Sequence, residues 1–274
     1  MMYIPDGTSE KTALSRTTHL AISAHQDDIE FMAYAPIAEC FGKRDKWFGA
    51  IVVTDGAGSP RSGLYADYTD EQMKEVRIVE QKKAAAIGEY GFLTMLGHPS
   101  KEVKDAGNAK IVEELSELIC KARPKYLYTH NLADKHETHV ATALKVIAAL
   151  RTLSPEERPE KVYGCEVWRD LDWMNDEEKV YLDCGAHPNL MRALSAVFDS
   201  QIAGGKRYDL AAEGRRLANA TFSASHACDT YSALNYAMDL TPLMDDRVEI
   251  SAYVSGFIDR FKASVKENIE RFLS

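Results

Sequence analysis

Two short segments of the sequence combine histidine with carboxylate residues at spacings that suit metal chemistry. In the first, AHQDDIE at residues 24–30, His25 is followed by the adjacent carboxylates Asp27 and Asp28. A histidine and a carboxylate three residues apart across a turn can both reach one metal ion, and both are ordinary zinc ligands. Two neighbouring buried carboxylates also repel each other unless a cation or a proton separates them. The structural alternative is that both aspartates cap the N-terminus of a helix.

The second segment is HNLADKHETH at residues 130–139, in which His136 and His139 fall three residues apart on one face of a predicted helix. Apolar residues from Ala143 to Leu150 continue that face, so both imidazoles are expected to point towards the sheet. Asp134 is a plausible cap for this helix. The alternative is a pair of partly buried histidines bonded to backbone carbonyls. A catalytic zinc site needs three protein ligands and an open position for water, and the two segments together can supply them.

Alternating strands and helices are predicted to position these segments. Strands are predicted at 19–25, 47–55, 92–96, 125–130 and 161–168, with helices at 29–42, 69–89, 108–122 and 136–150. This alternation favours right-handed βαβ units and a mostly parallel sheet, in a Rossmann-like three-layer α/β sandwich. Ligands bind beyond the carboxyl ends of parallel strands, so both segments are expected at the same edge of the sheet.

The later part of the chain is harder to assign. Residues 186–239 have a mainly helical pattern, and VEISAYV at 248–254 is a candidate late strand before a terminal helix. We expect a single domain over residues 1–274, with a core sheet at 19–168 and a C-terminal elaboration at 169–274.

Charge and cysteine usage exclude several classes of protein. The chain of 274 residues carries a formal net charge of −9, which disfavours nucleic acid and anionic membrane as partners. Its five cysteines are scattered without a CxxC pair, which argues against a disulfide scaffold and a thiolate zinc site. The first residues lack the apolar region of a signal peptide, and no apolar run approaches the ~20 residues of a membrane span. We expect a cytoplasmic protein that acts on a small molecule, and a homo-oligomer is possible.

The two segments and the residues between them resemble the LmbE-like, PIG-L-like zinc deacetylases, which hydrolyse N-acetyl groups of N-acetylglucosamine conjugates. The matching elements, in chain order, are AHQDDIE at 24–30, DGAGS at 55–59, Arg77–Glu80 and His136–His139. Gln26 stands where the family's A-H-P-D-D-I-E motif has proline. A late family element has a partial echo around His226. The likeness covers residues 19–150, in order.

The resemblance implies a role for each of these residues. The implied zinc ligands are His25, Asp28 and His139. Asp27 would be the general base for attack of zinc-bound water on the amide, and His136 would stabilise the developing oxyanion. Arg77 and His226 would contact the substrate, although Arg77 could equally pair with Glu80 on its own helix.

Two departures from the family leave questions open. Thr138 stands where an aspartate often precedes the last ligand, so Asp134 or Glu137 would have to tune His136. The C-terminal third matches weakly, and in this family that third usually shapes substrate choice. His226 and Asp229 repeat the HxxD spacing and could form a second metal site, but a structural pair is the simpler interpretation.

These observations favour a zinc-dependent N-deacetylase, a hydrolase acting on linear amides of amino-sugar conjugates. An enzyme with the same site could instead cleave another amide, such as that of a thiol conjugate. From a different class, a metal-free α/β protein that binds carbohydrate or nucleotide remains an alternative, in which Trp168 and Trp173 would stack on sugar rings or simply pack.

Overall fold

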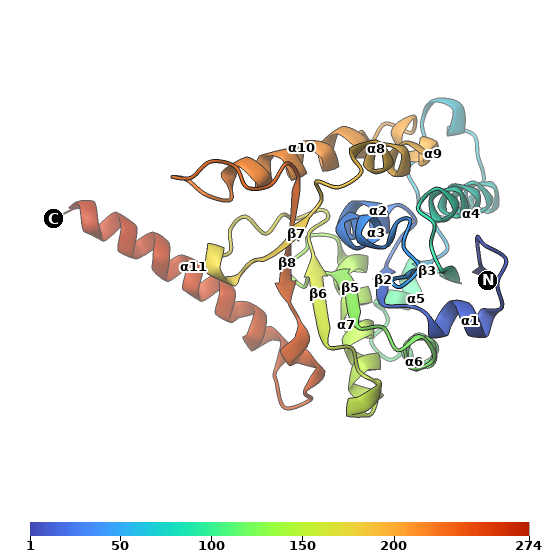
Figure 1. Ribbon diagram of the computed structural model, residues 1–274, viewed down its shortest axis with the longest axis horizontal. Coiled ribbons are helices and arrows are strands. Elements are labelled where there is room, and N and C mark those ends of the chain that lie inside the picture. The colour runs from blue at the N-terminus through green and yellow to red at the C-terminus, as the bar shows by residue number, and fades with distance from the viewer. Residues whose placement is uncertain (274) are drawn as a thin grey trace.

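The computed structural model describes residues 1–273, and over these residues one eight-stranded sheet lies between two layers of helices (Figure 1). The strands are β1 (Met2–Tyr3), β2 (His19–Ser23), β3 (Phe48–Thr54), β4 (Phe92–His98), β5 (Tyr126–His130), β6 (Lys161–Cys165), β7 (Val180–Asp183) and β8 (Leu234–Asp239). Their order across the sheet is β1-β4-β3-β2-β5-β6-β8-β7. Strands β4, β3, β2, β5 and β6 are parallel, and β1, β8 and β7 join antiparallel. The predicted mostly parallel α/β sheet is confirmed.

The helices fall on the two faces of this sheet. They are α1 (Glu10–Ser15), α2 (Asp28–Met32), α3 (Tyr34–Cys40), α4 (Asp70–Ile87), α5 (Ser100–Lys104), α6 (Ala109–Ala122), α7 (Glu137–Thr152), α8 (Pro188–Ala196), α9 (Asp199–Ile202), α10 (Tyr208–Phe222) and α11 (Ile250–Leu273). Helices α2, α3, α4 and α8 cover one face, and α1, α6 and α7 cover the other (Figure 1). Single-turn 3₁₀ helices lie at Gly63–Tyr65, Pro155–Glu157, Asp176–Glu178 and Thr241–Met244.

The central strands are buried on both faces, which is why they read as continuous apolar runs. In β2, Leu20 and Ile22 pack with residues of α6 and α7, whereas Ala21 packs with residues of α2, α3 and α4. Each of the five residues of β2 is buried. The sheet thus separates two apolar clusters, and the carboxyl ends of β2 and β5 lie side by side because these strands pair directly.

The structure corrects three sequence-based expectations. The helix predicted at 29–42 is broken at Ala33, because Pro36 has no N–H to donate to the carbonyl of Met32. The strand predicted at 248–254 is wrong: this segment begins α11, and Ile250, Tyr253 and Val254 pack on the core at helical spacing. The mainly helical segment 186–239 ends in β8.

Helix α11 is the most peripheral element. It extends away from the sheet, and the C-terminal end of the chain lies at its tip (Figure 1). Of its residues only Phe257 is fully buried. No helix in residues 1–273 combines the length and the apolar character that crossing a membrane requires.

Candidate active site

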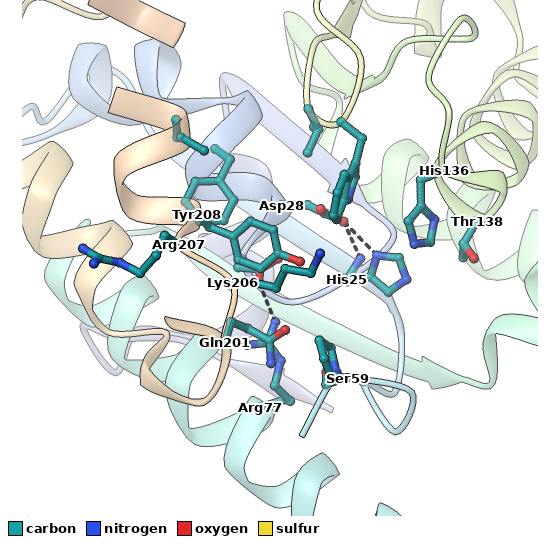
Figure 2. Close-up of a pocket in the computed structure, with 18 of the residues that line it drawn as sticks. His25, Asp28, Ser59, Arg77, His136, Thr138, Gln201, Lys206, Arg207 and Tyr208 are labelled. Atoms are coloured by element: carbon teal, nitrogen blue, oxygen red, sulfur yellow. Dashed lines mark hydrogen bonds and ion pairs between the residues drawn. The ribbon is translucent and has the colours of Figure 1, made fainter. Parts of the chain in front are cut away.

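The two predicted segments meet at one cavity beyond the carboxyl ends of β2 and β5. The cavity has a volume of about 410 Å³. One wall holds His25, Asp27 and Asp28 from the turn after β2, with His136 from the start of α7 (Figure 2). The opposite wall comes from the C-terminal third, over residues 201–215. The loop after β3 also lines the cavity, through Gly56, Gly58, Ser59 and Pro60.

Four potential ligand atoms of three residues converge at the first wall. His25 Nδ1 lies 3.2 Å from Asp28 Oδ2 and 3.2 Å from His139 Nε2, and His139 Nε2 lies 3.3 Å from Asp28 Oδ1. Nitrogen and oxygen ligands about 2.0–2.1 Å from a tetrahedral ion lie roughly 3.3 Å from one another. These separations therefore fit a zinc ion bound by two imidazoles and one carboxylate, and we call His25, Asp28 and His139 the ligand group.

A fourth histidine, His130, packs behind this group. Its ring stacks on that of His139 with centroids 3.9 Å apart, and its Nε2 lies 3.5 Å from Asp28 Oδ2. Together with Asp28 and His139 it forms a second group able to hold a metal. However, its Nε2 accepts the N–H of Ala24 at 2.8 Å, so that lone pair is not free to bind a metal. We therefore interpret His130 as a fully buried support for the turn after β2.

Asp134 joins His136 and His139, at the start of α7, to the segment that follows β6. Its carboxylate accepts the backbone N–H of His136 at 2.9 Å, that of Trp168 at 3.1 Å, and a hydrogen bond from His139 Nδ1 at 3.4 Å. Asp134 does not cap α7 as predicted: the N-cap residue is His136, and Asp134 instead accepts the N–H of that residue. Its carboxylate also fixes the ring of His139, as metal-bound histidines typically require.

Neither Asp134 nor Glu137 forms a hydrogen bond with the ring of His136, although the charge of Asp134 favours the protonated ring. Glu137 is exposed and forms an ion pair with Lys104 at 3.3 Å. The Nδ1 atom of His136 is buried and has no hydrogen-bond partner among the residues described. Burial and the charges of His139 and His25 lower the pKa of His136 to about 4, so this imidazole is neutral near pH 7 and can donate one N–H.

Asp27 adopts an unusual backbone conformation. Its φ is 86°, a region that residues other than glycine seldom occupy. Its N–H donates to Gln81 Oε1 at 3.0 Å, and its Oδ2 accepts from the guanidinium of Arg77 at 2.8 Å. Neither aspartate caps α2: Asp27 makes no capping hydrogen bond, and Asp28 instead accepts the N–H of His25 at 2.7 Å. The capping alternative is therefore not supported.

The charges of the two aspartates and His139 are strongly coupled. Burial raises the pKa of Asp27 to about 6, against the opposing charge of Arg77 and with the help of Asp28. Burial also disfavours ionised Asp28, but His139 and His130 outweigh it and lower its pKa well below the usual value. Burial lowers the pKa of His139, but Asp28 and Asp134 raise it to about 9. The cluster thus stabilises one positive charge between Asp28 and His139, where a cation would lie.

Arg77 reaches the cavity wall, but its amino groups are bonded to the protein. The side chain is 1% exposed, and it donates to Glu80 Oε2 at 2.9 Å, to Asp27 and to the carbonyl of Gln26. Of the two interpretations left open by the sequence, the pairing with Glu80 is present. The same guanidinium holds the carboxylate of Asp27.

His226 is not brought to this cavity. It is exposed in the loop between α10 and β8, and it does not line the cavity. The two tryptophans also differ: Trp168 lines the cavity, whereas Trp173 packs on Phe261 of α11. Sequence reasoning missed Lys206 and Tyr208, which line the opposite wall. Lys206 follows two glycines, and no local sequence pattern indicates that it lies at this cavity.

Comparison with known proteins agrees with this geometry. Residues 20–150 match the family model of PIG-L, described as GlcNAc-PI de-N-acetylase. This segment, which carries one wall of the cavity, is therefore similar to the PIG-L (LmbE-like) family. A comparison of the sequence with curated proteins found no match.

Solved structures share the fold at low sequence identity. The conserved protein TT1542 from Thermus thermophilus is 18% identical, with a TM-score of 0.62 over 81% of this chain and 94% of its own. GalB, the 4-carboxy-2-hydroxymuconate hydratase from Pseudomonas putida, is 16% identical, with a TM-score of 0.60 over 82% and 96%. The N,N'-diacetylchitobiose deacetylase from Pyrococcus horikoshii is 12% identical, with a TM-score of 0.59 over 85% and 88%. Because one of these proteins is a hydratase, the shared fold alone does not define the reaction.

Proposed function

We propose that this protein is a zinc-dependent hydrolase that removes the acetyl group from the amine of an N-acetylglucosamine-type conjugate. The convergence of His25 Nδ1, Asp28 and His139 Nε2 at separations of 3.2–3.3 Å carries this proposal. The match of residues 20–150 to the PIG-L family model, which is that of a de-N-acetylase, supports the choice of an amide substrate. The same groups would serve an amidase of different substrate range.

The ligand set suits a hydrolytic metal. His25, Asp28 and His139 would hold the ion, with Asp134 fixing the orientation of His139. A zinc ion bound by two neutral imidazoles and one carboxylate supplies Lewis acidity towards an amide carbonyl and lowers the pKa of water.

The remaining groups on this wall have roles in proton transfer and charge stabilisation. Asp27 lines the cavity, and its Oδ2 is held by Arg77, so its carboxylate is fixed beside the ligand Asp28. There it accepts the proton of the attacking water, as a general base. His136, neutral near pH 7, donates an N–H to the amide oxygen as negative charge develops. The departing amine takes a proton from Asp27 or from His136, and both line the cavity.

The C-terminal wall would select the substrate. Gln201, Lys206 and Tyr208 lie across the cavity from His25 and Asp28 (Figure 2), and Arg215 lines the same cavity. We therefore propose that residues 169–274 are part of one catalytic domain with residues 19–168.

The test combines metal analysis with acetate release. We expect one zinc per chain after purification without added metal, and acetate release from N-acetylglucosamine or its conjugates that a chelator abolishes. His139→Ala should lose the zinc. The matched control is His226→Ala, which removes an exposed imidazole outside the cavity and should retain it. Wild-type protein without stoichiometric metal would favour a metal-free binding protein, and zinc without acetate release would favour a different amide.

A further inference from the structure

The wall opposite the ligand group carries a lysine that points into the cavity. Lys206 precedes α10, and its side chain extends towards the centre of the cavity, whereas that of the adjacent Arg207 turns away (Figure 2). The Lys206 ammonium lies 5.4 Å from the centroid of the Trp168 ring. The Trp168 ring in turn lies 6.1 Å from that of His136. The Trp168 ring therefore lies near both His136, at the proposed reaction centre, and the Lys206 ammonium.

Two of the cations that line the cavity, Lys206 and Arg215, form no ion pair with a carboxylate of the described residues, whereas the other two do. Arg77 pairs with Asp27 and Glu80, and Arg207 pairs with Asp209 at 2.8 Å. Lys206 forms no ion pair with any carboxylate of residues 1–273.

The carboxylates that line the cavity are already engaged. Asp27 is paired with Arg77, and Asp28 contacts three histidines, two of them in the ligand group. Glu166 accepts hydrogen bonds from Asn219, Leu171 and Tyr236. Over the described residues, the cavity thus contains two cations without an ion pair, Lys206 and Arg215, and the side chain of Lys206 extends towards its centre (Figure 2).

We propose that Lys206 binds an anionic substituent, a phosphate or a carboxylate, on the substrate. This inference rests on the proposed function. The acetylated sugar ring would lie against Trp168, with its amide at the ligand group and the anion at the ammonium. A substrate that covers Lys206 removes water from the ammonium, and only a paired anion compensates for that loss.

The overall charge of the protein makes this local cation more significant. A chain of net charge −9 repels an anionic substrate at a distance. Recognition of such a substrate therefore depends on a positive group inside the cavity. Arg215, on the same wall, is held by a hydrogen bond to the carbonyl of Val167, whereas the Lys206 ammonium forms no hydrogen bond within the described residues.

The test compares neutral and anionic substrates of the zinc-loaded protein. The substrates are N-acetylglucosamine, the same sugar phosphorylated on its anomeric oxygen, and N-acetylmuramic acid, which carries a carboxylate. We expect wild-type kcat/KM to be higher for one or both anionic sugars, and the preferred one identifies the anion. Lys206→Gln should lower that value about ten- to a hundredfold, mainly through KM, and leave the neutral sugar unchanged. Lys206→Arg should restore most of it. Arg207→Gln is the matched control and should behave as wild type.

Three results would overturn the inference. They are a wild-type protein that does not prefer either anionic sugar, an equal loss on neutral and anionic sugars in Lys206→Gln, and an equal loss in Arg207→Gln. If wild-type protein releases no acetate from any sugar, the proposed function fails separately. Calorimetric binding of glucosamine phosphorylated on its anomeric oxygen then tests Lys206 directly. Weaker binding by Lys206→Gln than by Arg207→Gln would support the subsite, and equal binding would refute it.

Discussion

The substitution Asp134→Asn tests whether a carboxylate outside the ligand group controls metal binding. The carboxylate of Asp134 is fully buried and accepts three hydrogen bonds, with His139 and Trp168 on Oδ2 and His136 on Oδ1. Asparagine has one carbonyl oxygen, so in either orientation its NH₂ group faces at least one of these N–H donors.

Two magnitudes follow from this geometry. One buried donor left unpaired costs about 1–3 kcal/mol of the free energy of unfolding. Loss of the carboxylate behind a metal-binding histidine typically lowers metal affinity about 10–100-fold, which corresponds to about 1.4–2.7 kcal/mol. Asp134→Asn should therefore bind zinc more weakly and unfold at lower urea concentration.

Zinc affinity is measured by competition with a chromogenic chelator, and stability by urea unfolding of the metal-free protein. Glu137→Gln is the matched control, because this neighbouring carboxylate is exposed and pairs only with Lys104. It should change neither quantity. Wild-type zinc affinity in Asp134→Asn would refute the view that this carboxylate orients His139 for the metal.

Three further substitutions test the groups around Asp27. Asp27→Asn should retain zinc and reduce kcat at least about 10²-fold, because the general base is lost; full activity by acetate release would exclude that role. Gln81→Leu leaves the N–H of Asp27 without its acceptor, so urea unfolding should show a loss of about 1–3 kcal/mol, and wild-type stability would contradict the proposed support. Burial raises the pKa of Glu30 to about 8, so the folded protein holds a proton that the unfolded chain releases above about pH 4.3. The free energy of unfolding of the metal-free protein should therefore fall by about 1.4 kcal/mol per pH unit between these two values. Glu30→Gln should remove that slope, and an unchanged slope would disprove the assignment.

The sequence was most informative about the parallel core. Strands β2 to β6 were predicted to within a few residues, because strands buried on both faces are continuous apolar runs. The antiparallel strands β1, β7 and β8 were not predicted. Strands β1 and β7 have two and four residues, and the burial of such short segments depends on partners distant in sequence. Strand β8 has six residues, but the sequence analysis included it in the mainly helical segment 186–239. Helix α11 was misread at its start because four β-branched or aromatic residues within seven resemble a strand.

The proximity of the proposed metal ligands was predictable for a different reason. His25 and Asp28 come from one turn, and His136 and His139 from one helix start, so local spacing was sufficient to bring each pair together. Lys206 faces them across the cavity from a distant segment, and no local pattern indicated it. His130 supports the turn after β2 by accepting the N–H of Ala24. This contact forms only because β2 pairs with β5, so the local sequence does not indicate it.

The two walls of the cavity have separate origins in the chain, and this separation has an evolutionary consequence. The segment matched by the family model, residues 20–150, carries the ligand group, while the facing wall comes from residues 201–215. The two walls are joined where Glu80 accepts the N–H and the hydroxyl of Ser200 at 2.7 and 2.8 Å. A lineage that preserves this junction can exchange the facing wall without altering the groups that perform the reaction. A chimaera of two relatives should therefore be joined at this junction. It should combine the chemistry of the relative that supplies the first wall with the selectivity of the relative that supplies the facing wall.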